Sequence, residues 1–171
     1  LVAVAAGVVA LAGTRVAEAR PTVNLNAVAD TTIYNDSTSN SNGIGAYMHV
    51  GRTNNGAIRR GLVRFDVSSI PAGSTITAVS LRLNMSRSEV GAMNVTVHRL
   101  NGTFGEGTSN APNEEGQGAA ATTGDATWIR RVYNTINWTA QGGDFVAGAS
   151  ATTSVNANGN YTWSGATMVS N

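Results

Sequence analysis

The sequence predicts an all-β protein built from short strands. Gly, Ala, Thr, Ser, Asn and Val dominate its 171 residues, whereas charged residues make up 12% and there are three prolines. This composition is typical of many short strands joined by polar turns. Several segments also alternate apolar and polar side chains with a period of two, the pattern of a strand with one buried face. Long helices are not expected.

The first two strands are expected between residues 26 and 51. Residues 26–34 form a short β-prone segment, and the polar stretch 35–45 that follows predicts a long turn. Residues 47–51 alternate again, which predicts a short strand with two different faces. A turn rich in Asn and Gly follows at residues 53–57.

The clearest strand is predicted at residues 61–67. Val63, Phe65 and Val67 fall on one face. Leu62, Arg64 and Asp66 fall on the other. We expect the first, apolar face to meet the core and the second to face solvent.

Two alternating strands follow the compact turn at residues 68–73. They cover residues 76–86 and 93–100, and we expect them to pair across the turn at 89–91. Residues 101–127 then form a connection that is long enough to suggest a purpose. A functional loop, an ion-binding loop and disorder of its middle all remain open.

The C-terminal part returns to β-prone sequence. Aromatic segments at 128–133 and 137–139 are followed by a Gly-rich turn. A last pair of strands is expected at 149–155 and 161–163, joined by a hairpin-like connection at 156–160.

The N-terminal segment resembles a secretory signal whose charged front end is missing. Thirteen uncharged residues precede Thr14 and Arg15, and Ala17 and Ala19 supply the small residues of a cleavage site. A signal core needs about 7 to 15 apolar residues, whereas a membrane-spanning helix needs about 20. We therefore expect residues 1–19 to be a partial signal peptide, 20–25 a short linker, and the mature protein to be secreted or on the cell surface. A buried or anchoring helix is the alternative.

Charge and cysteine content exclude several function classes. The formal net charge is +1 and the eleven basic residues are all Arg, so no broadly basic surface for nucleic acid is expected. There is no cysteine, which excludes disulfides, thiol redox chemistry and thiolate metal sites. The mature chain is not expected to be an integral membrane protein.

Several stretches carry a family resemblance. Residues 60–76, with the run RFD-SS-PAG-T, resemble the DNRLRE domain of secreted and surface proteins. That family overlaps the alginate-binding type of carbohydrate-binding module, family 96. Further segments share the resemblance to this family or to its bacterial subgroup: 30–33, 78–83, 105–109, 124–128 and 142–145.

The resemblance covers most of the chain from Asn26 onward. It implies one β-sandwich domain of jelly-roll type over residues 26–171, with which the alternation agrees. It also implies a cut C-terminus, because in the family the segment matching 166–171 continues into another turn and a closing strand. We therefore expect an unfilled strand position with an exposed apolar edge.

Sugar recognition is the chemistry that these residues favour. Carbohydrate modules stack sugar rings on aromatic faces and bind hydroxyls and carboxylates with charged or amide groups. The alginate-binding relatives imply an acidic polysaccharide, which a cluster of arginines would attract. The candidate ligand-binding residues are Arg52, Arg59, Arg60, Arg64, Tyr47 and His49. Alternatively, the arginines pair with Asp66 and other local acids as ordinary surface charges.

Other candidate residues have weaker patterns. Trp128, Trp138 and Trp163 are either stacking platforms or core residues. A structural Ca²⁺ needs six to eight oxygen ligands, although no calcium-loop spacing is present. The candidate ligands are Asp30, Asp66, Glu106, Asp125 and Asp144.

Catalysis has little support. The two histidines fall on different strands, and Glu114 and Glu115 are expected in a solvated loop. We predict a secreted, non-catalytic sandwich that binds extracellular or cell-wall polysaccharide as one module of a larger surface protein. A structural or adhesive module without a sugar site is the alternative, and a polysaccharide-cleaving enzyme is a third hypothesis.

Overall fold

The longest strands, β1 (Ala27–Tyr34) and β4 (Ile58–Phe65), pair antiparallel in the computed structural model, which describes residues 21–171. Their β-branched and aromatic residues suit extended backbone. The short β3 (Gly51–Arg52) pairs with the other edge of β4, which gives the order β1-β4-β3. The predicted signal peptide, residues 1–19, lies outside the described residues.

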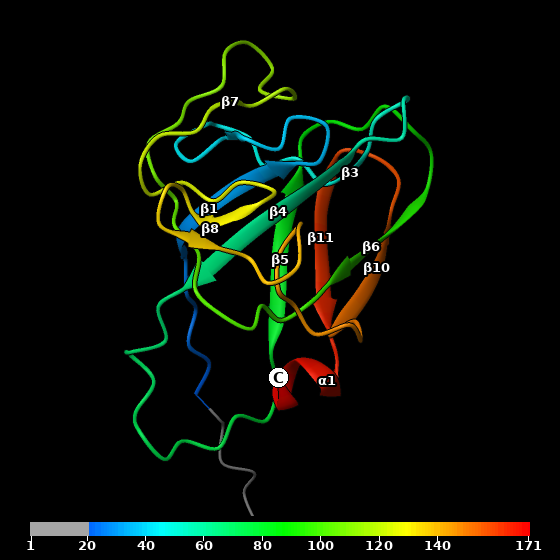
Figure 1. Ribbon diagram of the computed structural model, residues 1–171. Coiled ribbons are helices and arrows are strands. Elements are labelled where there is room, and N and C mark those ends of the chain that lie inside the picture. Colours follow the sequence, from blue (N-terminus) through cyan, green and yellow to red (C-terminus); the bar gives the residue numbers. More distant parts are fainter. Residues whose placement is uncertain (1–20) are drawn as a thin grey trace, which may run out of the picture.

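Two further sheets arise from nested pairs of strands (Figure 1). β5 (Ser80–Met85) pairs with β11 (Gly159–Ser164). Within that pair, in chain order, β6 (Met93–Val97) pairs with β10 (Ala151–Val155). All of these pairs are antiparallel, and the nesting is that of a jelly roll, which confirms the predicted β-sandwich. The expected pairing of residues 76–86 with 93–100 is wrong, because each strand pairs with a C-terminal strand instead.

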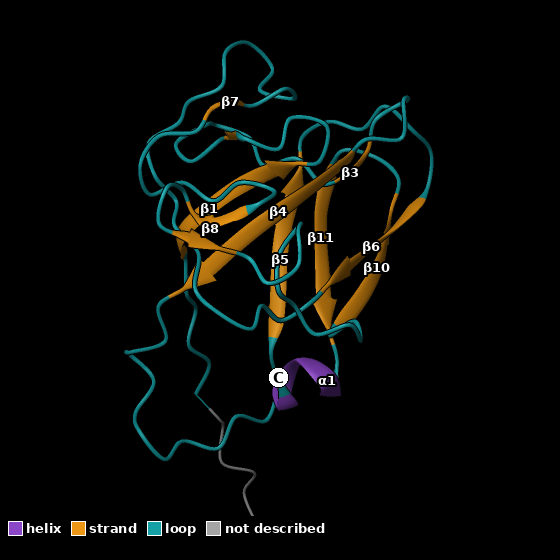
Figure 2. Cartoon of the chain, in the orientation of Figure 1, coloured by secondary structure: helices purple, strands orange, loops and turns teal. Residues whose placement is uncertain are grey.

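The remaining elements are short (Figure 2). They are β2 (Asn40–Ser41) with β7 (Ala119–Ala120), β8 (Arg130–Val132) with β9 (Ile136–Asn137), and the helix α1 (Ala166–Ser170). The strand predicted at 47–51 is wrong for most of its length, because only Gly51 belongs to a strand. No helix within residues 21–171 has the length and apolar character that crossing a membrane requires.

The core packs against the face of β4 that carries Arg60, Leu62 and Arg64. Leu62 is buried with Ile33, Phe104 and the indole of Trp128. Val67, on the face predicted to be buried, is 59% exposed. The prediction chose the wrong face, because it placed Leu62 on the side that faces solvent although Leu62 is buried in the core.

The tryptophans belong to the interior. Trp128, Trp138 and Trp163 are all buried, which favours the core interpretation over exposed stacking platforms. Trp163 of β11 also donates its indole N–H to the Val95 carbonyl of β6 at 2.8 Å. This hydrogen bond ties the β5–β11 sheet to the β6–β10 sheet.

The long connection at residues 101–127 is ordered. Phe104, Asp125 and Ala126 are buried in it, and β7 within it pairs with β2. The hypothesis of a disordered middle is therefore wrong. Backbone and side-chain hydrogen bonds to β1 and to the turn after it hold this segment against the β1–β4 sheet.

Candidate functional site

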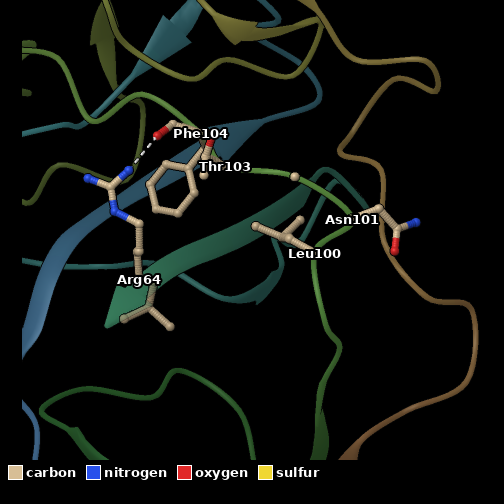
Figure 3. Close-up of a pocket in the computed structure, with 7 residues that line it drawn as sticks. Arg64, Leu100, Asn101, Thr103 and Phe104 are labelled. Carbon is tan, nitrogen blue, oxygen red and sulfur yellow. Dashed lines mark hydrogen bonds between the residues drawn. The ribbon is translucent and has the colours of Figure 1, made fainter. Parts of the chain in front are cut away.

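An open groove of about 350 Å³ lies where the end of β4 meets the segment that follows β6. Val63 and Arg64 line it from β4, and residues 100–104 form the opposite wall. Figure 3 shows the Arg64 guanidinium beside the Phe104 ring, with Leu100 and Asn101 further along the same wall. The volume is at the lower end of the range for ligand sites, roughly 300 to 1,000 Å³.

Arg64 is the exposed cation of this groove. Its guanidinium carbon lies 5.7 Å from the centre of the Phe104 ring. Its Nη1 donates to the Phe104 carbonyl oxygen at 3.2 Å. Phe104 is buried, so it fixes the arginine from beneath, and the other N–H groups of Arg64 have no acceptor within residues 21–171. The Arg64 guanidinium is therefore a positively charged hydrogen-bond donor that is held in a fixed orientation.

The strand alternation of β4 separates the predicted arginines. Arg60 shares a face with Arg64, but its guanidinium lies 4.9 Å from the ring centres of both Trp128 and Phe145. It also donates to the Gly142 carbonyl at 2.6 Å. Burial lowers the pKa of Arg60. Arg60 therefore fastens a turn to the sheet and is half-buried.

Arg59 lies on the opposite face and is only 5% exposed. It donates to both carboxylate oxygens of Asp36, at 2.7 and 3.2 Å. The hydrogen bond from Arg59 lowers the pKa of Asp36. Arg52 is exposed and donates to the Gly56 carbonyl at 3.1 Å. Asp66, the expected acidic partner, instead accepts from the Ser68 N–H.

Tyr47 and His49 lie in a non-strand segment that crosses the outer face of β1 and β4. The His49 N–H donates to the Thr32 hydroxyl at 2.9 Å, and Met48 contacts Gly61 of β4. Tyr47 is 52% exposed. Burial lowers the pKa of His49. These two residues lie near Arg59 and Arg52 rather than at the groove of Arg64.

Glu115 anchors that segment, although we expected it in a solvated loop. Its carboxylate is buried and accepts from the Ala46 N–H at 2.9 Å, the Tyr47 N–H at 2.8 Å and the Asn42 amide at 2.8 Å. Burial by itself raises the pKa of Glu115, but these hydrogen bonds outweigh it and lower the pKa. The expectation was wrong because a loop residue at φ 63° turns its side chain into the fold, which no sequence pattern signalled.

The candidate calcium ligands do not form one cluster. Asp66 and Asp144 each accept local backbone N–H groups, and the buried Asp125 accepts from Ser109 and Thr122. The Asp30 N–H donates to the Glu106 carboxylate at 3.0 Å, and the Asp125 carboxylate lies near the backbone of Glu106 and Gly107. Within residues 21–171 no group of three His, Asp or Glu side chains converges as a metal site would require. Calcium binding stays a prediction.

Comparison with family models decides the class of the protein. Residues 21–141 match carbohydrate-binding module family 96, more than half of the chain. The chain belongs to this family. The match confirms the resemblance found in the sequence, and it includes every residue that lines the groove of this family 96 module. Searches of curated proteins and of solved structures gave no match.

Proposed function

We propose that this family 96 module is exported, lacks catalytic activity and binds an acidic polysaccharide at the Arg64 groove. Membership of family 96 supports carbohydrate as the ligand. The fixed, exposed guanidinium of Arg64 is the observation that supports a carbohydrate with carboxylate groups. Arg binds carboxylates through two parallel hydrogen bonds, and Arg64 has free N–H groups for this purpose. The module works within a larger surface protein.

The groove suits a polymer better than a small molecule. It is open to solvent along residues 100–104 and has both polar and apolar walls, with Asn101 and Thr103 beside Leu100 and Phe104. A chain that lies along such a wall places hydroxyl groups near the polar side chains and carboxylates near Arg64. Non-catalytic binding fits this site because neither histidine lines it.

Calorimetric titration with an oligouronate tests this proposal. Arg64→Ala is expected to weaken binding about tenfold, because a hydrogen bond to a charged group contributes about 1.5 kcal/mol or more. Arg82→Ala is the matched control, since Arg82 is exposed on β5 and outside the groove. The affinity of the unmodified module should fall as salt is added.

A failure to bind would favour the alternative function. If the unmodified module binds neither charged nor neutral polysaccharides, a structural or adhesive role without a sugar site becomes the better account. Equal losses in Arg64→Ala and Arg82→Ala would instead keep sugar binding and remove the groove as its site. Turnover of a glycan would contradict the non-catalytic role.

A further inference from the structure

Asn101 lies in the wall of the groove and is followed by Gly102. In such an Asn-Gly pair the main-chain nitrogen of the glycine can attack the side-chain amide carbon of the asparagine, because no glycine side chain obstructs the approach. Asparagine is a thermolabile residue. Asn101 is exposed, and its side-chain amide makes no hydrogen bond with residues 21–171. The amide can therefore rotate toward the nitrogen of Gly102.

The main-chain nitrogen of Gly102 is available for this attack. Its N–H has no acceptor in the part of the chain that the structure describes. The residue before it is held in place, since the Asn101 N–H donates to the Asp144 carbonyl at 2.9 Å. Attack at Asn101 thus breaks no hydrogen bond of the fold. The groove is open to solvent, so water reaches the site.

The sequence contains three other Asn-Gly pairs, and the structure restrains the glycine in each. They are Asn42-Gly43, Asn55-Gly56 and Asn158-Gly159. The Gly43 N–H donates to the Ser109 hydroxyl at 3.0 Å. The Gly56 N–H donates to the Thr53 carbonyl at 2.9 Å, and Gly159 belongs to β11 of the β5–β11 sheet. Of these four pairs within residues 21–171, the one in the groove alone lies outside a strand and has a glycine N–H without an acceptor.

We propose that Asn101 is a site of spontaneous deamidation, and that its conversion to a carboxylate lowers the affinity of the groove for acidic polysaccharide. The Gly102 nitrogen bonds to the side-chain amide carbon of Asn101, the bond from that carbon to Nδ2 breaks, and ammonia leaves with the proton of the Gly102 N–H. Water then opens the succinimide ring at one of its two carbonyl carbons. Opening at the side-chain carbon gives aspartate. Opening at the main-chain carbon gives isoaspartate, in which the chain runs through the side chain.

Either product changes the groove near its cation. Arg64 and Asn101 line the same groove (Figure 3), and three residues of chain, from 101 to 104, span at most about 11 Å. A negative charge at position 101 repels the carboxylates of an acidic ligand and competes with them for Arg64. Isoaspartate also lengthens the main chain of the wall by one carbon atom. The loss of affinity rests on the proposed function, whereas the reaction itself does not.

Ageing of the purified module, followed by peptide mapping with mass spectrometry, tests the reaction without a ligand. Asn55 is the internal control, because it is also exposed and also precedes a glycine. Asn101 is expected to deamidate about fivefold faster, because attack at Asn55 first breaks the hydrogen bond of the Gly56 N–H. The products at position 101 should include both aspartate and isoaspartate. Equal rates at the two residues, or a faster rate at Asn55, would overturn the proposal.

Titration with an oligouronate tests the consequence for binding. Asn101→Asp is expected to bind about two- to fivefold more weakly than the wild-type module, and Asn55→Asp equally well. The wild-type module should lose affinity as it ages, whereas Asn101→Gln should keep its own starting affinity, because its longer side chain forms the ring far more slowly. Equal affinities of Asn101→Asp and Asn55→Asp, or an equal loss in aged Asn101→Gln, would overturn the effect on binding. No binding by the fresh wild-type module would overturn the proposed function, while the ratio of the two deamidation rates still decides the reaction.

Discussion

The Arg59 guanidinium lies 4.8 Å from the centre of the Tyr34 ring, and the two residues are register partners across β4 and β1. The Tyr34 hydroxyl in turn donates to the Glu115 carbonyl at 3.0 Å, and burial raises the pKa of Tyr34 to about 12. A side chain fixed in this way supports the fold from within. Experiments can separate what the Arg59 side chain contributes to ligand binding from what it contributes to stability.

Arg59→Ala is expected to lower the free energy of unfolding by about 1 to 3 kcal/mol, because it removes the Asp36 ion pair and the contact with the Tyr34 ring. Arg52→Ala should change it by less than about 0.5 kcal/mol, since Arg52 is exposed. Urea denaturation of both variants measures this difference. Equal stability of the two variants would contradict the structural role of Arg59.

Glu115→Gln is expected to lower stability at neutral pH by about 1 to 3 kcal/mol, because an amide cannot accept all three donors. The lowered pKa of Glu115 adds a pH dependence. A carboxyl group whose pKa is lower in the folded state stabilises above its unfolded value of about 4.5, and this contribution is lost as the pH falls through the folded value. Glu115→Gln should flatten that acid limb in urea titrations from neutral pH to about pH 3.

The neighbouring Glu114 provides the control for that experiment. Glu114 is 74% exposed and pairs with Arg87 on the surface. Glu114→Gln should leave both the stability and its acid limb nearly unchanged, because exposed pairs contribute about 0 to 1 kcal/mol. An acid limb that flattens equally in both variants would remove Glu115 as its origin.

Gly118→Ala is expected to destabilise the fold by about 1 to 3 kcal/mol. Gly118 has φ 68°, and an added Cβ would lie 2.7 Å from the Tyr34 ring. Gly91→Ala is the matched substitution, because a Cβ added to Gly91 would have nothing within 4 Å and the φ of Gly91 is not positive. Thermal unfolding should rank Gly118→Ala clearly below Gly91→Ala, and the reverse order would contradict the contact with Tyr34.

Asp30→Asn is expected to raise stability at neutral pH slightly, by less than about 1 kcal/mol. Burial, and then the negative charge of Glu106, raise the pKa of Asp30. An acid with a raised folded pKa costs stability once both states are ionised, so removing its charge helps. Melting curves with and without calcium chloride also test the predicted metal site, because Asp30→Asn should abolish any stabilisation by calcium that this carboxylate mediates.

The class of fold and most strand positions follow from local sequence. The period-two patterns at residues 76–86 and 149–155 correspond to β5 and β10, and the inner side chains Leu81 and Leu83 are half-buried as expected. Strand partners could not be derived in this way. Period-two alternation places side chains on a face without saying which distant strand that face will meet.

The candidate site was only partly accessible to sequence reasoning for a related reason. Arg64 was identified as a candidate, but the proximity of Arg59, Arg60 and Arg64 in sequence concealed their division between two faces of β4. Phe104 was missed because only the fold brings its ring against the Arg64 guanidinium.

The nested order of the strands governs when this protein can fold. β5 and β6 are synthesised early, yet their hydrogen-bonded partners β11 and β10 come from the far end of the described chain. Closing such long loops is slow, and a nascent chain exposes unpaired strand edges until then. The β5–β11 and β6–β10 sheets are therefore completed only after nearly all of the chain shown here has left the ribosome, whereas the strands of the β1-β4-β3 sheet are available much sooner.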